Sequence, residues 1–198
     1  MNNYYNQNAK TFFEGTAYVD MSMQYQDFLA NVPKGGLILD AGCGSGRDSR
    51  LFKEAGYEVV AMDGSVELCK LASEHIGQEV VNIRFQDIAL NRLTNGQVTF
   101  DGIWAAASLL HVPSLEIEEV LCKLKDVLKQ DGIFYASFKY GAFEGERNGR
   151  YFYDLKEDTA KALFTKVGFK VEKMWITGDV REGRGDEKWL NILVKKHR

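Results

Sequence analysis

The chain has 198 residues, of which 45% are hydrophobic and 27% charged, a balance typical of a folded globular protein. Its formal net charge of −3 argues against a nucleic-acid partner, because there is no overall positive charge to attract phosphates. Three widely spaced cysteines favour neither a disulfide framework nor a zinc cluster, which indicates a reducing compartment such as the cytoplasm. We expect no signal peptide and no membrane-spanning segment.

Apolar runs and helical patterns alternate along the sequence. Residues 1–33 are expected to form an N-terminal extension, polar and aromatic at first and then helical, and residues 34–198 the core of a single domain, 1–198. Expected strands cover residues 37–39, 57–62, 80–85, 100–105, 133–138, 169–177 and 188–194. Expected helices cover residues 20–31, 48–55, 65–75, a segment from 114 that ends at Asp131-Gly132, and 157–167.

The order of these elements predicts the fold class. Strands that alternate with helices form βαβ units and a mainly parallel sheet. The last two expected strands have no helix between them, so they should pair antiparallel. The sequence therefore predicts an α/β fold with a doubly wound, Rossmann-like, seven-stranded sheet, mostly parallel and closed by an antiparallel C-terminal hairpin strand.

A glycine-rich turn follows the first expected strand and leads into a helix. Gly42, Gly44 and Gly46 alternate with other residues, whereas the dinucleotide pattern G-x-G-x-x-G would require glycine at position 47 or 49. Glycines let the backbone turn sharply and approach a ligand closely, and the following helix begins with free N–H groups. The alternative is a tight strand–helix turn without a ligand.

Two carboxylates follow the next two expected strands. Asp63, before Gly64 and Ser65, lies where an acid can accept hydrogen bonds from two ribose hydroxyls. Asp87, between Gln86 and Ile88, lies where an acid can bind an adenine amine. The alternatives are a helix cap for Asp63 and an ordinary loop position for Asp87.

This set of motifs resembles the class I S-adenosylmethionine-dependent methyltransferases over residues 37–194. The segment 40–46 is similar to the first motif of that family, and the segment 100–112, which ends in Leu-Leu-His-Val, to its fourth-strand segment. Residues 46–49 also resemble those of tellurite-resistance-type and thiol methyltransferases. The resemblance implies S-adenosylmethionine as the cofactor, bound by Asp40, Gly42, Cys43, Gly44, Arg47, Asp63, Gly64, Ser65, Gln86, Asp87, Ile88, Ala105, Ala106 and Leu110.

Methyl transfer from an activated sulfonium needs alignment and a proton acceptor more than an elaborate catalytic triad. His111 follows the fourth expected strand and is the candidate general base, with a packed, backbone-bonded histidine as the alternative. The fourth-strand edge carries Ala105-Ala106-Ala107-Ser108 rather than clustered carboxylates, so we expect no metal.

Two loops are expected to bind the substrate, at residues 139–153 and 178–188. Both mix cationic and glycine residues, and converging arginines could hold a carboxylate or a phosphate. The N-terminal aromatic residues are expected to fold over the site as a lid that excludes water. The alternatives are solvated loops and a frayed tail. The candidate substrate-binding residues are Tyr5, Lys139, Tyr140, Arg147, Arg150 and Arg181.

The sequence thus favours methyl transfer to a small-molecule nucleophile, with an anion as a candidate substrate and with neither a membrane nor a nucleic acid as partner. Two alternatives stay open at this point. One is a non-catalytic module that binds S-adenosylmethionine or another nucleoside, and the other is an NAD-dependent oxidoreductase on a similar fold.

Overall fold

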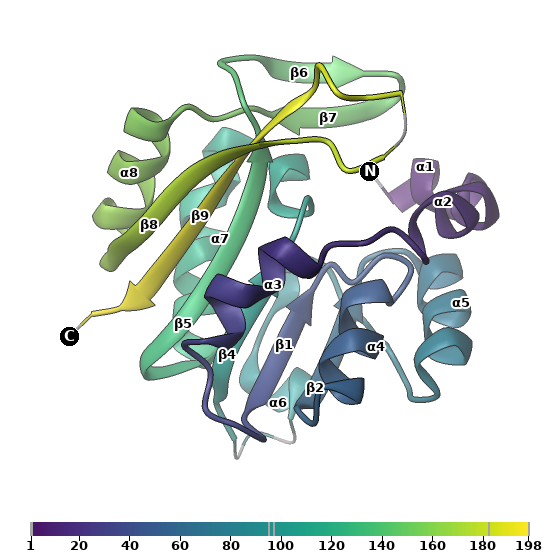
Figure 1. The fold of residues 1–198 in the computed structure, drawn as a ribbon, viewed down its shortest axis with the longest axis horizontal. Helices are drawn as coiled ribbons and strands as arrows, with labels where there is room; N and C mark the ends of the chain where they lie inside the picture. The colour runs from purple at the N-terminus through teal and green to yellow at the C-terminus, as the bar shows by residue number, and fades with distance from the viewer. Residues whose placement is uncertain (1, 95, 97, 182, 198) are drawn as a thin grey trace.

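The computed structural model describes residues 2–94, 96, 98–181 and 183–197. It confirms the expected seven-stranded sheet, whose strand order is β3-β2-β1-β4-β5-β9-β8 (Figure 1). Strands β1 to β5 are parallel, and β9 lies between β5 and β8 and is antiparallel to both. The bounds are β1 (Leu37–Ala41), β2 (Glu58–Asp63), β3 (Val81–Asn82), β4 (Phe100–Ala105), β5 (Leu128–Lys139), β8 (Phe169–Gly178) and β9 (Lys188–Lys196).

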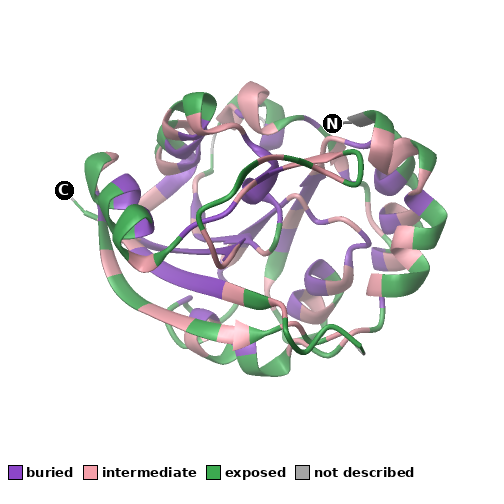
Figure 2. Ribbon diagram, turned by 90° about the horizontal axis from the view of Figure 1, so that it is seen from above, coloured by how far each residue is buried: buried purple, intermediate pink, exposed green. Residues whose placement is uncertain are grey.

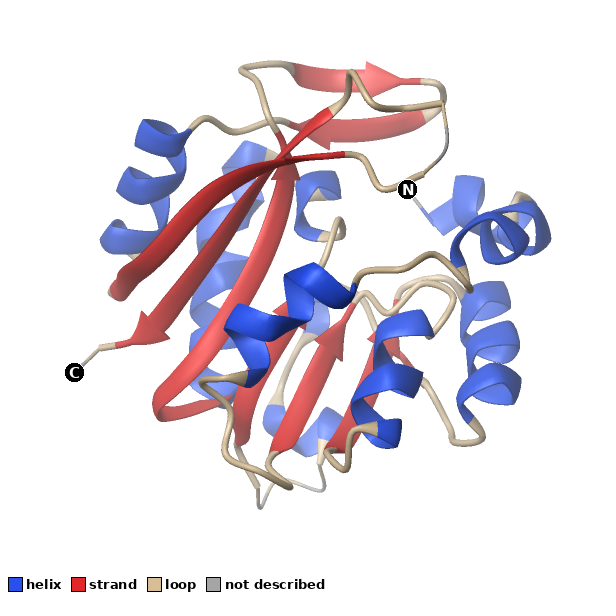
Figure 3. Cartoon of the chain, viewed as in Figure 1, coloured by secondary structure: helices blue, strands red, loops and turns tan. Residues whose placement is uncertain are grey.

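Helices cover both faces of this sheet (Figure 3). One face is covered by α3 (Ser22–Leu29), α4 (Arg47–Glu54) and α5 (Val66–Ile76), and the other by α6 (Leu90–Leu93), α7 (Ser114–Val127) and α8 (Glu157–Lys166). Short 3-10 helices follow β3 (Phe85–Asp87) and β4 (Leu109–His111). The N-terminal helices α1 (Asn2–Gln7) and α2 (Ala9–Thr16) both contact α5.

Two apolar layers result from the alternation of side chains along each strand. On β4, Ile103 faces the layer under α7 and α8, whereas Trp104 faces the layer under α3 and α4. Trp104 stacks on Tyr135 with ring centroids 3.9 Å apart, and Phe28 and Phe52 pack around this pair. Figure 2 shows the buried positions concentrated along the sheet and on the inner sides of the helices. Helix α3 is thus part of the core.

The expected element boundaries are wrong in three places. Helix α7 ends at Val127 rather than at residues 131–132, because β5 begins at Leu128 and passes Asp131 in a left-handed conformation with φ of 61°. Strand β3 covers only Val81 and Asn82, because the chain soon afterwards enters a 3-10 helix that begins at Phe85. Helix α3 begins at Ser22 rather than residue 20, and Asp20 instead accepts a hydrogen bond from the Ser22 backbone N–H.

The segment 139–153, expected to be a substrate-binding loop, contains a β-hairpin. Strands β6 (Glu144–Arg147) and β7 (Arg150–Tyr153) pair antiparallel through a turn with left-handed Asn148 and Gly149. This hairpin lies beyond the carboxyl end of β5 (Figure 1). Among the described residues, no helix is both long and apolar enough to cross a membrane.

Candidate functional site

The glycine turn after β1 forms the floor of the site. Gly42, Gly44 and Gly46 all have positive φ, at 82°, 55° and 77°. A Cβ at Gly42 would lie 2.6 Å from the Ser108 Cβ, and one at Gly46 would lie 2.7 Å from the Ile76 side chain, so both positions need glycine for packing as well as for conformation. Helix α4 starts immediately afterwards, and its first N–H groups have no partner within the helix.

Two cavities meet above this turn. One, of about 600 Å³, lies over β2 and β3 and includes Asp63; we call it the Asp63 cavity. The other, of about 620 Å³, extends toward the connection between β8 and β9; we call it the β8–β9 cavity. The residues shared by both walls form what we call the junction. They are Tyr5, Phe12, Gly42, Gly44, Ala107 and His111.

Asp63 ends β2 and is held by backbone N–H groups. Its Oδ2 accepts from the Gly44 N–H at 3.0 Å and its Oδ1 from the Ser65 N–H at 2.8 Å. Burial raises the pKa of the carboxyl group, although these N–H groups act in the opposite direction. Each carboxylate oxygen has two acceptor positions, so each keeps one for a ligand hydroxyl.

The structure brings only some of the residues around Asp63 and Asp87, which were expected to bind the cofactor, to the wall of the Asp63 cavity. Gly64, Ser65 and Gln86 line it. Asp87 lies outside both cavity walls, where its carboxylate pairs with Arg84 at 2.9 Å, and Ile88 is buried in the core beneath. The wall of the cavity instead contains three apolar residues that we did not identify from the sequence, namely Leu68, Ile83 and Phe85.

Asp40, expected to contact the cofactor, lies behind the turn rather than on a wall of either cavity. It is 2% exposed and accepts a 2.6 Å hydrogen bond from the Ser49 hydroxyl. Burial and the neighbouring Asp48 raise the pKa of Asp40 well above its usual range. Ala105 is fully buried in the core and also lies outside the walls.

Asp48 lines the β8–β9 cavity instead, and it forms a buried polar cluster. Its carboxylate accepts from the Tyr25 hydroxyl at 2.6 Å, from the Trp104 Nε1 at 2.7 Å and from the Arg47 guanidinium at 2.6 and 3.0 Å. These donors hold the pKa of Asp48 below its usual range despite burial. Cys43, Arg47, Ala106 and Leu110, which were expected to bind the cofactor, line the same cavity.

His111 occupies the junction and carries a defined tautomer. Its Nδ1 lies 2.6 Å from the Tyr151 carbonyl oxygen, which can only accept, so Nδ1 carries the proton. Its Nε2 is therefore the acceptor for the Tyr5 hydroxyl at 2.7 Å. Burial lowers the pKa of His111 to about 4, which keeps the imidazole neutral. The hydrogen bond also joins helix α1 to the junction, and closure of this helix as a lid stays a prediction.

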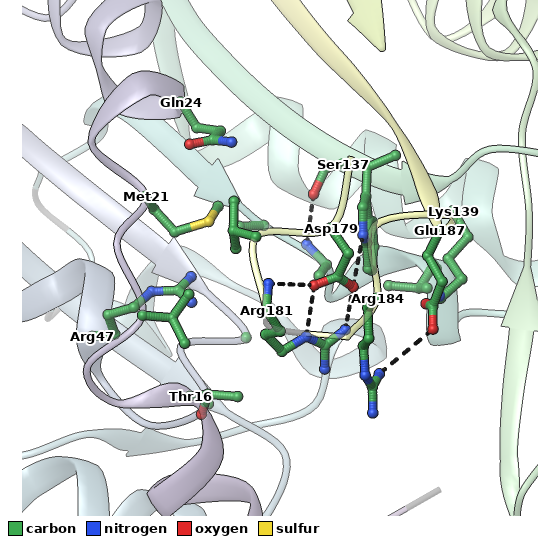
Figure 4. Close-up of a pocket in the computed structure, with 18 of the residues that line it drawn as sticks. Thr16, Met21, Gln24, Arg47, Ser137, Lys139, Asp179, Arg181, Arg184 and Glu187 are labelled. Carbon is green, nitrogen blue, oxygen red and sulfur yellow. Dashed lines mark hydrogen bonds and ion pairs between the residues drawn. The ribbon is translucent and has the colours of Figure 1, made fainter. Parts of the chain in front are cut away.

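The two substrate segments converge on the β8–β9 cavity, but most of their cations are already paired. Figure 4 shows Arg181 bound to Asp179, with Arg47 and Met21 on one side and Lys139 and Glu187 on the other. The Arg181 Nε lies 2.9 Å from Asp179, which is itself held by the Trp189 Nε1 at 3.1 Å. Two further cations of these segments also form ion pairs with carboxylates, Lys139 with Glu187 and Arg147 with Asp154.

Tyr140 is the one candidate substrate residue that lies outside both cavity walls. Within the described part of the chain, no group of three or more His, Cys, Asp or Glu residues is arranged to hold a metal ion.

Several wall residues of the β8–β9 cavity were not recognised in the sequence. Thr16, Met21 and Gln24 come from the N-terminal segment, and Tyr135, Ser137, Trp189 and Asn191 come from β5 and β9. Asn191 is 2% exposed and accepts a 2.6 Å hydrogen bond from the Tyr135 hydroxyl. A polar residue within the apolar run of β9 was the only available signal, and its partner could not be known without the strand register.

The sheet order, with an antiparallel strand between β5 and the edge strand, and the glycine turn that faces Asp63 define a Rossmann-like fold of the methyltransferase type. A family model described as a methyltransferase domain matches residues 38–132. The ubiquinone biosynthesis O-methyltransferase of Haemophilus ducreyi is 30% identical over 122 residues, which are 59% of this chain and 51% of that protein. The chain thus spans about half the length of the curated relative it matches.

Solved structures match over nearly the whole chain. A Burkholderia thailandensis 1,6-didemethyltoxoflavin-N1-methyltransferase, solved with its substrate and S-adenosylhomocysteine, has a TM-score of 0.76 at 20% identity and covers 99% of this chain and 85% of that one. A TehB-like methyltransferase from Corynebacterium glutamicum has a TM-score of 0.67 at 19% identity, with 98% and 97% coverage. The family model, the curated relative and the solved structures support a class I S-adenosylmethionine-dependent methyltransferase. At these identities the structural likeness shows the fold alone, so the subfamily stays a prediction.

Proposed function

We propose that the chain transfers the methyl group of S-adenosylmethionine to a small acceptor bound in the β8–β9 cavity. The observation that carries this proposal is the meeting of two cavities at the glycine turn, with a ribose-type carboxylate in one and a cationic wall in the other. An extended nucleoside cofactor and a second reactant fit this arrangement, because the cofactor can extend from the Asp63 cavity across the junction to Arg47, while the acceptor occupies the rest of the β8–β9 cavity.

The residues around the Asp63 cavity suit an adenosine. The two remaining acceptor positions of Asp63 match the two hydroxyls of a ribose. The amide of Gln86 and the apolar wall with Phe85 and Ile83 suit a purine ring. At the other side of the turn, Arg47 and the first N–H groups of α4 suit the carboxylate of the methionine end. Asp40 then supports the turn from behind through Ser49 rather than touching the ligand.

When bound, the cofactor supplies a methyl group activated on a sulfonium. The contribution of the chain is then to align the acceptor with that methyl group and to exclude water. Alignment of two reactants can supply roughly 7–11 kcal/mol of the barrier. The Tyr5–His111 hydrogen bond holds helix α1 over the junction, where it would shield the reacting atoms. With a pKa of about 4 and its Nε2 occupied, His111 suits this positioning role better than that of a strong general base.

The acceptor is proposed to be a small anionic molecule. The β8–β9 cavity is lined by six cationic side chains, namely those of Arg47, Lys139, Arg147, Arg150, Arg181 and Arg184, and by only three carboxylates, Asp48, Asp179 and Glu187. This excess of positive charge contrasts with the negative net charge of the chain. The relatives named above act, by their names, on a ubiquinone precursor pathway and on 1,6-didemethyltoxoflavin, which are small-molecule contexts. Neither a nucleic acid nor a membrane is proposed as partner, and the cytoplasmic location stays a prediction.

Titration calorimetry with S-adenosylhomocysteine and with NAD tests the cofactor assignment. We expect binding of the first and not of the second, and the reverse result would favour the oxidoreductase alternative. A turnover screen of small organic acids, with formation of S-adenosylhomocysteine as readout, then separates an enzyme from a binding module. A protein that binds the cofactor tightly but methylates none of the acids or their neutral analogues would favour the module.

A further inference from the structure

One of the cations of the β8–β9 cavity differs from the other five. Arg47, Lys139, Arg147, Arg181 and Arg184 each form an ion pair with a carboxylate. Arg150 forms no ion pair with any described residue, and its Nε is buried without a hydrogen-bond partner. A buried guanidinium N–H without an acceptor is costly, so its presence in a cavity wall points to a ligand that supplies the acceptor.

Aromatic rings fix the position of Arg150. Its guanidinium carbon lies 5.0 Å from the ring centroid of Tyr4 and 5.1 Å from that of Phe152. Phe152 in turn packs on His111 at 4.9 Å, and Tyr4 packs on Tyr5 at 5.4 Å. Because His111 and Tyr5 belong to both cavity walls, Arg150 lies beside the junction rather than at the far end of the β8–β9 cavity.

The charge of Arg150 is felt at the junction. Burial raises the pKa of the Tyr5 hydroxyl, and Arg150 opposes this increase through a hydrogen bond and through its charge. Burial lowers the pKa of the His111 imidazole, and the charge of Arg150 lowers it further. A positive charge at this place repels a sulfonium, unless an anion lies between the two. A neutral acceptor would also need a base, and the Nε2 of His111 is already bonded to Tyr5. An acceptor that arrives ionised meets both conditions.

We infer, on the basis of the proposed function, that Arg150 binds the negative charge of the methyl acceptor at the junction and that the reacting atom is an ionised oxygen, such as that of a carboxylate or an acidic enol. A lone pair of this oxygen forms the new O–C bond, while the methyl–sulfur bond breaks and its electron pair remains on sulfur. The negative charge of the acceptor and the positive charge of the sulfonium disappear together, so no proton has to be removed.

The first test compares benzoate with its neutral analogue benzamide as probes on the protein loaded with S-adenosylhomocysteine. We expect benzoate to bind at least about tenfold more tightly, because hydrogen bonds to a charged group exceed neutral ones by this order. Arg150→Gln should abolish the preference, and Arg150→Lys should keep part of it. Arg50→Gln is the charge-matched control, since Arg50 pairs with Glu54 on the exposed side of α4. Equal binding of the two probes, no binding of either, or an unchanged preference in Arg150→Gln would overturn the inference.

The second test asks whether the anion lies next to the methyl group. Benzoate should strengthen the binding of S-adenosylmethionine about tenfold more than that of S-adenosylhomocysteine, because only the former carries the sulfonium charge. Formation of methyl benzoate would support the inference directly. Equal strengthening of both would put the anion away from the reacting atoms and overturn it. Failure of the cofactor assignment on which the proposed function depends is distinguishable, because wild-type protein would then not bind S-adenosylhomocysteine in the absence of a probe.

Discussion

The Asp63 cavity and the β8–β9 cavity have similar volumes, but the chain builds them in different ways. The Asp63 cavity is lined mainly by short segments at the ends of the parallel strands, with residues of α1 and α2 on one side, and backbone N–H groups orient its main polar side chain. The β8–β9 cavity combines the N-terminal helices, the end of β5, the β6–β7 hairpin and the β8–β9 connection, and side-chain ion pairs give it its charge. One cavity therefore depends on local backbone geometry, and the other on pairs of residues far apart in the sequence.

The largest expected effect concerns the buried cluster at the base of the β8–β9 cavity. Asp48→Ala would leave the Tyr25 hydroxyl, the Trp104 N–H and the buried part of the Arg47 charge without their acceptor. Removal of one partner from a buried ion pair costs about 3–5 kcal/mol of unfolding free energy. Urea denaturation measures the loss. Glu54→Ala, which breaks an exposed pair with Arg50, should cost under about 0.5 kcal/mol, and a similar small loss for Asp48→Ala would contradict the importance of the cluster.

A second prediction concerns pH and the junction where the cavities meet. Burial lowers the pKa of His111 to about 4 in the folded protein, whereas an unfolded histidine titrates near 6.5. The unfolded chain thus binds the proton first, so the contribution of His111 to stability is complete above pH 6.5 and decreases as the pH falls toward 4. The full difference corresponds to about 3 kcal/mol.

Because other carboxyl groups titrate in the same range, the measurement is the difference between the wild-type protein and His111→Gln, each unfolded in urea at several pH values between 4 and 7.5. The wild-type protein should lose stability more steeply below pH 6.5. Parallel curves would mean that His111 is hydrated and accessible to protons in the folded state.

The sequence predicted the sheet and the local parts of the Asp63 cavity because these follow from patterns within a few residues. The alternating glycines, the carboxylate after β2 and the missing helix between β8 and β9 were each visible in one segment. Asp87 and Ile88, expected at the cofactor, are not on the cavity wall, because β3 stops after two residues and Asp87 lies in the following 3-10 helix, where it pairs with Arg84. Where such residues lie depends on where the strand ends and the next helix begins, and the sequence composition does not indicate this boundary.

The ion pairs of the β8–β9 cavity could not be predicted from the sequence, for another reason. Which of several loop arginines lacks a carboxylate partner depends on the hairpin register, which sets Arg150 opposite Arg147 and brings Arg147 to Asp154. The sequence predicted cations in the right segments but could not distinguish those that form ion pairs from Arg150, which forms none with a described residue. Likewise, the buried Asp48 cluster joins α3, α4 and β4 through contacts between residues up to 56 positions apart.

A third prediction sharpens the contrast within the Asp63 cavity itself. Asp63→Ala should weaken the binding of S-adenosylhomocysteine about 100-fold, because two hydrogen bonds to a carboxylate are lost. Stability should also fall, since the N–H groups of Gly44 and Ser65 lose their acceptor. Asp87→Ala is the matched control, and its affinity should stay within about threefold of the wild-type protein. A larger loss for Asp87 than for Asp63, measured by calorimetry, would reverse our assignment of the two acids.

The smallest effect is expected at the lid, where the two cavities share a wall. Tyr5→Phe removes the hydroxyl that donates to His111 but keeps the ring packing on Phe12. One neutral hydrogen bond contributes about 1 kcal/mol, so bound S-adenosylhomocysteine should dissociate about fivefold faster, as followed by stopped-flow displacement. Tyr4→Phe is the control, because the ring of Tyr4 packs on Tyr5 and Arg150 and both packings survive the change. If both variants release the ligand at the wild-type rate, helix α1 does not close the junction through this bond. If both release it faster, ring packing rather than the Tyr5 hydroxyl holds the helix in place.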